Sequence, residues 1–445
     1  MAVSGAENYA SIGAILTEVV IEGIAQVIPE HAVLQKMTPF DSKLIKSGLK
    51  LVQPTLVRYP DGFSHVLAGV GPVQLNPAKA GKIERAEIVS NNIYLVDAID
   101  KDMIDRCKQD NGKYDKPAVK QATAVLFPAL IAAAKREEEM VTLYGQSGRG
   151  AATYANSSWS GIVATVAGVT AVTVDKASWG PGLWTGSEGM DLTFFDDSNN
   201  TCLATASLAA VNMDTRTLTL DANVTTALQT ATTGPISIWR SSTRKALSGT
   251  PQYNESIGLQ AILANTGTLF NIDASKYNLY RSPQFSAGSA ALSLAKVLSL
   301  SSRASYTGTG SGAVLLVPVD SWTDLSTAET GMRRWLDGPT GAVKIGPDAL
   351  TFYGATGSMA IKAHPMLKRG GAMLLNLNAN SGTPGGDLKR VGDCEWTYDT
   401  TGAGDMLHYV PGLSGYEIRL KANKGTFMNP PGRSANITSI VDGQA

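Results

Sequence analysis

The stretch from Lys116 to Tyr144 constrains the fold of this chain more than any other, because it is typical of one long helix. Asp115 is a suitable N-cap, Pro117 falls in the first turn where its missing N–H is tolerated, and Gly145 follows as a C′ residue. At 1.5 Å per residue such a helix is about 43 Å long. This length is unusual for an ordinary domain, so we expect the rest of the chain to be organised around the helix.

Apolar residues recur along this helix at three- and four-residue steps, and Glu137 interrupts them. The stripe consists of Val119, Ala122, Leu126, Ala129, Ala133, Met140 and Tyr144. Taken alone, the stripe also fits a plain core helix of a large domain. The sequence on either side decides between the two interpretations.

Charge and composition exclude several classes of protein. Lys and Arg total 38, as do Asp and Glu, which argues against a strongly basic nucleic-acid-binding protein and leaves only local basic patches open. The three cysteines, Cys107, Cys202 and Cys394, have no metal-ligand spacing and indicate a reducing compartment. Residues 1–9 lack the basic start of a secretion signal, and the longest apolar run, 122–134, is too short to cross a bilayer. We therefore expect a soluble protein without a membrane partner.

The first hundred residues do not read as a compact domain. Residues 11–28 predict an amphipathic helix that ends at Pro29, within an N-terminal arm of residues 1–50. Strands are predicted over 51–59 and 82–98, separated by a Gly- and Pro-rich excursion. This pattern indicates a projecting β-hairpin, which is only marginally stable alone and needs a partner surface, most naturally another copy of the chain. A short helix over 97–106 then leads to the long one.

The character of the chain changes after Gly145. Short β-rich runs separated by turn residues predict a small β-barrel or sandwich over 150–243, inserted into a parent fold. The predicted strands are 161–166, 169–174, 190–195, 202–211, 217–220 and 236–239. The remainder, 244–445, predicts a mixed α+β arrangement. Its expected helices are 257–263, 286–302 and one that Asp320 caps, and its expected strands include 313–319, 349–363, 373–377, 416–421 and 434–441.

The sequence holds no convincing catalytic, cofactor-binding or metal site. None of the four histidines lies at a metal-ligand spacing from a second His or Cys. The Gly-rich stretch 307–312 precedes a strand, whereas a phosphate-binding loop follows a strand and opens a helix. Six charged residues suit contacts between subunits instead, and the basic ones equally suit DNA phosphates. They are Glu137, Glu138, Arg333, Arg334, Lys368 and Arg369.

The order of these elements resembles the major capsid proteins of tailed bacteriophages with the HK97 fold. Four stretches carry the resemblance: 91–100 before the long helix, 138–145 at its end, 253–272 after the insertion, and 357–370. The resemblance implies an α+β fold of five segments. They are an N-terminal arm (1–50), an extended E-loop hairpin with its return strand (51–98), a peripheral domain with the spine helix (99–149), the inserted all-β domain (150–243), and an axial domain with returning peripheral strands (244–445).

The same resemblance implies self-assembly into hexamers and pentamers that close an icosahedral shell in the virion, built in the cytoplasm of the host bacterium. The E-loop would lie over the spine helix of a neighbour, and the inner face would enclose double-stranded DNA without sequence specificity. Portal, scaffold or decoration proteins would be further partners. Some members cross-link an E-loop lysine to an asparagine of a neighbour, and here Lys79 and Lys82 lie in that loop. No enzymatic activity or cofactor is expected.

Three alternatives remain open at this point. A bacterial nanocompartment shell of the encapsulin type would have the same fold but a protein cargo. A β-rich surface adhesin or fibre subunit would fit the Thr-, Ser- and Gly-rich stretch 150–243, although a secretion signal would then be expected. An enzyme that used the stretch 308–312 would bind nucleotides. Electron microscopy of the expressed protein separates shells from the other two classes.

Overall fold

The computed structural model describes most of the chain, as two compact units. The described residues are 33–38, 50–66, 74–100, 116–152, 161–164, 168–229, 235–247, 250–310, 312–333, 350–355, 357–377, 387–393, 396–399, 407–409 and 415–441. The first unit takes in 1–32, 91–139 and 392–424, and the second takes in 33–90, 140–391 and 425–445. The helix predicted over 11–28 therefore lies outside the described residues.

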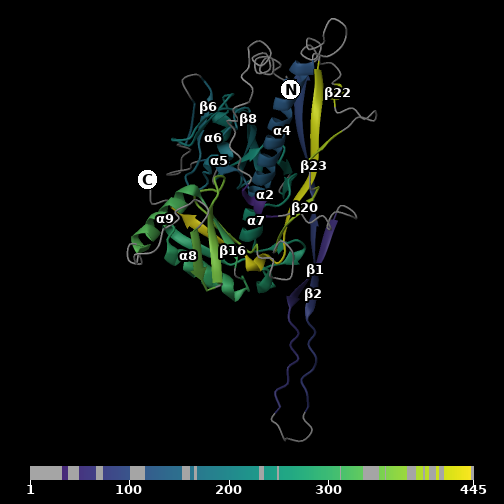
Figure 1. The fold of residues 1–445 in the computed structure, drawn as a ribbon, viewed down its shortest axis with the longest axis vertical. Helices are drawn as coiled ribbons and strands as arrows, with labels where there is room; N and C mark the ends of the chain where they lie inside the picture. The colour runs from purple at the N-terminus through teal and green to yellow at the C-terminus, as the bar shows by residue number, and fades with distance from the viewer. Residues whose placement is uncertain are drawn as a thin grey trace. The chain divides into compact units, whose positions relative to one another are not determined.

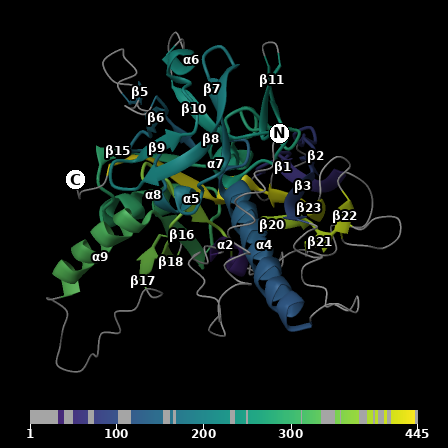
Figure 2. The ribbon, with the colours of Figure 1, turned by 90° about the horizontal axis from the view of Figure 1, so that it is seen from above.

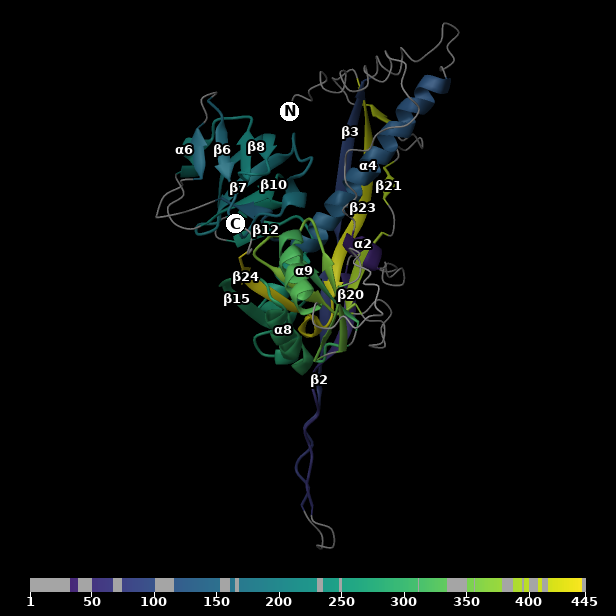
Figure 3. The same cartoon turned by 60° about the vertical axis from the view of Figure 1, so that its left-hand side comes forward.

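The first unit is a helix packed on a small antiparallel sheet. Strand β3 (Asn91–Asp100) pairs along its whole length with the first part of β23 (Gly415–Met428). The short strands β21 (Thr397–Tyr398) and β22 (Leu407–Tyr409) also pair with β23. Helix α4 (Lys116–Tyr144) lies beside β3 and β23 (Figure 3), and its Leu130 is buried with Ile418 and Leu420 of β23. The long helix thus has the bounds that its N-cap and C′ signals predict.

Two predictions in this region are wrong. Residues 97–100 are not helical, because the pairing of β3 with β23 extends to Asp100 opposite Gly415. Residues 82–98 are not one strand, because Ser90 separates β2 (Lys82–Val89) from β3. These two strands pair with different partners, β1 (Lys50–Arg58) and β23. Long-range pairing, which local sequence does not encode, decides both boundaries.

A mixed six-stranded sheet forms the body of the second unit. Its strand order is β15-β24-β19-β16-β18-β17. The strands are β15 (Gln284–Ala290), β16 (Ala313–Val317), β17 (Leu350–Gly354), β18 (Gly357–Ala363), β19 (Ala372–Leu375) and β24 (Ala435–Ile440). Helices α8 (Leu294–Tyr306) and α9 (Val319–Arg333) cover one face (Figure 2), where Val297 and Leu325 are buried against strand residues such as Leu315.

The helix predicted over 286–302 is half wrong. Residues 284–290 form β15, which pairs in parallel with β24, and the helix begins only at Leu294. Gly288 and Ser289 both have positive φ angles, of 67° and 53°, which no α-helix accommodates. The run of small Ser, Ala and Gly residues here gives no periodic signal that separates strand from helix.

Residues 150–240 form a seven-stranded antiparallel sheet that curls on itself (Figure 1). Its order is β4-β10-β7-β8-β9-β6-β5. The strands are β4 (Gly150–Ala151), β5 (Ile162–Ala164), β6 (Thr170–Thr173), β7 (Asp191–Asp196), β8 (Thr201–Asn212), β9 (Thr217–Leu220) and β10 (Ile236–Arg240). All six strands predicted between 161 and 239 are confirmed.

Backbone contacts join β4, the first strand of this order, to the end of β6, the last but one. Ala152, directly after β4, forms an antiparallel bridge with Val174, directly after β6. The N–H of Asp175 adds a 2.8 Å hydrogen bond to the carbonyl oxygen of Ala151. We call this curled sheet the barrel. Two short helices, α5 (Pro181–Trp184) and α6 (Thr225–Gln229), complete it.

The chain enters and leaves the barrel at one point, at the end of α4. The N–H of Gly258 donates to the carbonyl oxygen of Gly145 over 2.8 Å, and Arg149 forms a buried ion pair of 3.1 Å with Glu255. Neither glycine tolerates a side chain. A Cβ on Gly258 would overlap the backbone of Gly145, and a Cβ on Gly145 would overlap the carbonyl oxygen of Ser256. We call this contact the junction.

Shorter elements fill the rest of the second unit. They are α2 (Val33–Met37), α7 (Leu259–Ala264), β11 (Arg244–Leu247), β12 (Thr250–Tyr253), β13 (Thr268–Leu269), β14 (Ile272–Asp273), the 3₁₀ turns η2 (Asn278–Tyr280) and η4 (Pro431–Arg433), and β20 (Leu388–Gly392). Strand β20 pairs with β23.

The junction predicts that alanine substitution lowers the free energy of unfolding at one glycine and leaves it nearly unchanged at another. Gly258→Ala should lower the free energy of unfolding by about 1–3 kcal/mol, because the added Cβ forces the two backbones apart. Gly267→Ala is the matched control, since a Cβ there meets nothing within 4 Å. Urea unfolding of the full-length chain followed by circular dichroism measures both, and equal stabilities for the two variants would contradict the close contact.

Candidate functional site

Several of the exposed large apolar side chains among the described residues lie on the β1–β2 hairpin. In this register Leu56 lies opposite Ile83, with Val52 and Val89 further along the same ribbon. These four side chains are 45–65 % exposed. Because side chains alternate across a strand, they share one face, which we call the apolar face. An exposed apolar patch on an ordered element is typical of an interaction surface.

The opposite face of the hairpin is anchored to its own unit. Val57, Ala86 and Ile88 are buried there. The N–H of Glu87 donates to the carbonyl oxygen of Phe270 over 2.9 Å, and the Asn429 side chain donates to the Thr55 hydroxyl over 2.7 Å. The base of the hairpin is therefore held in one orientation while its apolar face is left uncovered.

Two extended arms continue beyond the paired strands (Figure 1). A hydrogen bond of 3.0 Å from the N–H of Asp61 to the carbonyl oxygen of Lys79 joins them, and Asn76 donates through its side chain to the carbonyl oxygen of Phe63 over 2.8 Å. Phe63 and Leu75 are about three-quarters and two-thirds exposed, respectively. Burying side chains of this size stabilises a contact by about 1.5–3 kcal/mol each, so the arms favour a partner.

The two lysines predicted as assembly contacts both lie on this hairpin. Lys79 is 4.0 Å from the carboxylate of Asp61 and is largely exposed. Lys82 forms a 2.6 Å ion pair with Glu84 and lies over the ring of Tyr277. The hydrogen bond that Lys82 donates to Glu84 raises the pKa of Lys82 above its ordinary value. Exposed pairs of this kind add little stability, so both ammonium groups remain accessible.

Glu138, in contrast, is engaged within its own chain. It is buried, accepts a 3.3 Å hydrogen bond from the indole N–H of Trp396, and lies 3.5 Å from the ammonium of the equally buried Lys424. This internal ion pair helps to fix α4 on its sheet, and the contact between subunits predicted for Glu138 stays a prediction. Its neighbour Glu137 is half-buried.

The three arginines predicted as assembly contacts are described to different extents. Arg369 forms a 2.6 Å ion pair with Asp320 and is partly exposed. Arg333 is the last residue of α9, and its side chain lies outside the described residues, as does the whole of Arg334. The contacts predicted for these three residues stay predictions.

Lys368 is partly buried beside the junction, and the contact between subunits predicted for it stays a prediction. Its ammonium donates to the carbonyl oxygen of Gly148 over 2.6 Å, approaches the side-chain oxygen of Gln260 at 3.4 Å, and lies 4.4 Å from the ring centre of Tyr144. Burial, with a smaller contribution from the positive charge of Arg149, lowers the pKa of Lys368 to about 7. The ring and the two oxygens offset part of the cost of burying this charge.

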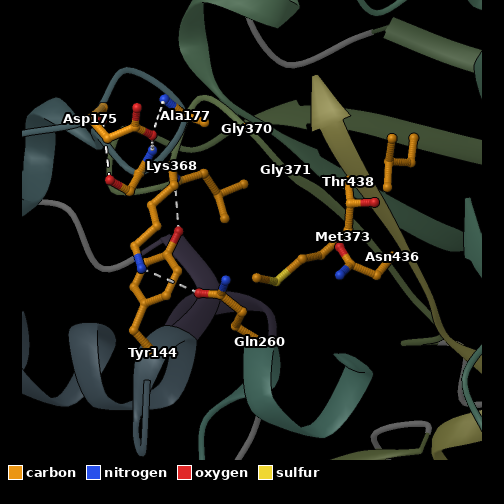
Figure 4. Close-up of a pocket in the computed structure, with 13 residues that line it drawn as sticks. Tyr144, Asp175, Ala177, Gln260, Lys368, Gly370, Gly371, Met373, Asn436 and Thr438 are labelled. Atoms are coloured by element: carbon orange, nitrogen blue, oxygen red, sulfur yellow. Dashed lines mark hydrogen bonds between the residues drawn. The ribbon is translucent and has the colours of Figure 1, made fainter. Parts of the chain in front are cut away.

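A cavity of about 280 Å³ opens next to Lys368, between the barrel and the six-stranded sheet (Figure 4). We call it the seam pocket. Its walls come from the end of α4, the segment after β6, α7, the turn after β18, and strands β19 and β24. The lining residues used below are Asp175, Gln260, Leu367, Lys368, Met373, Asn436 and Thr438. Sequence reasoning missed this pocket, because its residues come from five separate stretches.

Within the described residues, neither a metal site nor a membrane span is found. No group of three His, Cys, Asp or Glu residues there is placed to hold a metal ion. No helix in that part of the chain combines the length and apolarity needed to cross a bilayer.

Comparison with known proteins identifies the fold. No family model matches the sequence, and no curated protein matches it either. Among solved structures, the capsid asymmetric unit of cyanophage A-1(L) is similar with a TM-score of 0.51 and 12 % identity, over 96 % of this chain and 98 % of that one. The chain has the HK97-like capsid fold.

Two further matches are weaker. A structure from Mycobacterium phage Bobi aligns with a TM-score of 0.43 and 8 % identity, over 97 % of both chains. The SrpI encapsulin complex of Synechococcus elongatus aligns with a TM-score of 0.40 and 8 % identity, over 100 % of this chain and 98 % of that one. With such low sequence identity, the capsid fold is recognisable in this chain by its architecture rather than by shared residues.

Lys368 predicts a pH dependence of stability for this capsid fold. Its pKa is near 7 when folded and about 10.4 when unfolded, so between these values the unfolded chain binds more protons. The contribution of Lys368 to the free energy of unfolding should therefore rise as the pH increases from 7 to 10. Lys368→Met should flatten this rise, measured by urea unfolding of both chains at several pH values. Parallel pH profiles would contradict the depressed pKa.

Proposed function

We propose that the protein is the major capsid protein of a tailed phage. Copies assemble into hexamers and pentamers, and these close an icosahedral shell around the double-stranded DNA genome. The observation that carries the proposal is the HK97-like capsid fold over 96 % of the chain. The uncovered apolar face of the hairpin supports it independently, because a stable monomer rarely leaves such a ribbon exposed.

Each segment has a role in this proposal. Residues 1–50 form an arm that grips another subunit, 51–98 form the E-loop and return strand, and 99–149 carry the spine helix of the peripheral domain. Residues 150–243 are an inserted domain at the capsomer surface, and 244–445 form the axial domain and return to the peripheral domain. The junction supports the idea of an insertion, since the chain leaves and re-enters the body at adjacent residues, Gly145 and Gly258.

The role is structural rather than catalytic. The shell belongs to the virion and assembles in the cytoplasm of the host bacterium. Portal, scaffold and decoration proteins are its further partners, and packaged DNA meets its inner face without sequence specificity. Balanced charge suits a container that releases its DNA, because 38 cationic and 38 anionic side chains leave no net attraction for phosphate.

Electron microscopy of the expressed full-length chain tests the proposal. Closed shells or capsomers are expected. Shells purified from infected cells should contain DNA, whereas a protein cargo would favour a nanocompartment. A compact monomer at high concentration would contradict both.

The apolar face predicts a specific assembly defect. Leu56→Asp should abolish shells and leave the subunit folded, because it places a charge in a contact that excludes water. Its side chain is about half exposed in the single chain, so the unassembled subunit tolerates the change. Leu56→Met is the matched control and should assemble normally. Sedimentation velocity and negative-stain microscopy report assembly, and circular dichroism reports folding. Normal shells from Leu56→Asp would show that this face of the hairpin takes no part in the contact between subunits.

A further inference from the structure

The seam pocket contains the amine of a lysine that forms no ion pair within the described part of the chain. Lys368 lines this pocket, and no carboxylate there lies within ion-pair distance of its Nζ. The positive charge of Arg149 acts on the amine, while Glu255 pairs with Arg149 instead. Desolvation and a like charge both oppose the charged form of an amine, so this setting favours the neutral form of Lys368.

Two oxygen atoms match the neutral form of this amine. Nζ of Lys368 lies 2.6 Å from the carbonyl oxygen of Gly148 and 3.4 Å from the side-chain oxygen of Gln260. An ammonium group has three N–H donors, whereas a neutral amine has two and a lone pair. The two oxygens can accept both N–H groups of the neutral amine, which leaves its lone pair unused. A lysine in this state is a nucleophile.

The pocket provides room for a small molecule next to this amine (Figure 4). An apolar cavity of about 150 Å³ holds a benzene molecule, so about 280 Å³ holds a ring of that size with a small substituent. Leu367 and Met373 supply apolar surface to the walls. The pocket therefore fits a compact molecule with an apolar body.

The charges of the walls favour a neutral molecule over an anion. Lys368 is the only cationic side chain among the residues that line the pocket, and the carboxylate of Asp175 belongs to the same lining. Once the amine is neutral, an anion would be buried there without a counter-charge, which is unfavourable. Asn436 and Thr438 lie together in another part of the lining and offer an amide and a hydroxyl to a neutral polar group (Figure 4).

We propose that Lys368 is a covalent binding site for small neutral aldehydes. The lone pair of Nζ attacks the carbonyl carbon, and a C–N bond forms while the π electrons of the carbonyl move to its oxygen. That oxygen then leaves as water with the two amine protons, and a C=N bond remains. Amine and aldehyde thus give imine and water, with no oxidant or reductant. The proposal concerns the folded single chain and does not depend on assembly.

Reductive alkylation of the full-length wild-type chain tests the proposal, with benzaldehyde as the probe and sodium cyanoborohydride as the reductant. The hydride converts each imine to a stable benzyl-lysine, and peptide mapping by mass spectrometry quantifies every site. Near neutral pH, Lys368 should react at least about tenfold faster than the largely exposed Lys79, because an ordinary lysine with a pKa of about 10.4 is almost wholly protonated there. A rate at Lys368 equal to or below that at Lys79 would overturn the proposal.

The pH dependence of the same reaction separates an activated amine from a merely accessible one. The rate at Lys368 should level off above about pH 8, because its pKa of about 7 leaves little ammonium at that pH. The rate at Lys82 should continue to rise, since its hydrogen bond to Glu84 raises its pKa above the ordinary value. In concentrated urea the two profiles should become alike. Parallel profiles in the folded chain would contradict the proposal.

A pair of variants tests whether the aldehyde reaches Lys368 through the pocket. Thr438→Phe fills the pocket and should slow benzylation of Lys368 about tenfold without changing that of Lys79, because the ring occupies the space of the aldehyde. Thr201→Phe, at an exposed threonine of β8, is the matched control and should change neither rate. Circular dichroism verifies folding. An unchanged rate at Lys368 in folded Thr438→Phe would overturn the proposal.

The charge of the aldehyde provides a test that needs no variant. Replacing benzaldehyde by 4-carboxybenzaldehyde should lower the ratio of the rate at Lys368 to the rate at Lys79 at least about threefold. The added carboxylate would share the pocket with Asp175 and find no cation there. An unchanged ratio would show that the reaction takes place outside the pocket and would overturn the proposal.

Discussion

The backbone contact between Gly145 and Gly258 is the constraint on which the arrangement of the second unit depends. It joins the end of α4 to the start of α7 and brings together the two ends of the barrel segment. The buried pair of Arg149 and Glu255 locks the contact laterally, because breaking either side would leave a buried charge without a partner. The barrel is therefore positioned by these fixed contacts where the chain enters and leaves it.

The β1–β2 hairpin, in contrast, is anchored on one face only. Its inner face is anchored by Thr55 and Glu87, while Val52, Leu56 and Ile83 on the outer face remain in water. A rigid base with an uncovered apolar face loses little conformational entropy when it docks, so the binding free energy is not spent on ordering the ribbon. This arrangement favours contact with a partner surface.

Sequence reasoning succeeded where the signal is local. The caps around α4, the strand at β1 and the turn-separated strands of the barrel were all predicted from neighbouring residues. It failed where distant pairing decides, as at Asp100 in β3 and at Ser286 in β15. The neighbours of Glu138 and Lys368, which are Lys424 and Tyr144, could not be predicted either, because they are distant in the sequence. The seam pocket gave no sequence signal, since its walls come from five stretches that are far apart in the chain.

The bridge between Ala152 and Val174 has a consequence for crowding. A sheet with two open ends offers unpaired backbone groups, and many copies held side by side would then add strands to one another without limit. The contact of residues 151–152 with 174–175 pairs backbone groups at the β4 edge within the barrel itself. The β4 edge is thus less available for strand addition by another molecule.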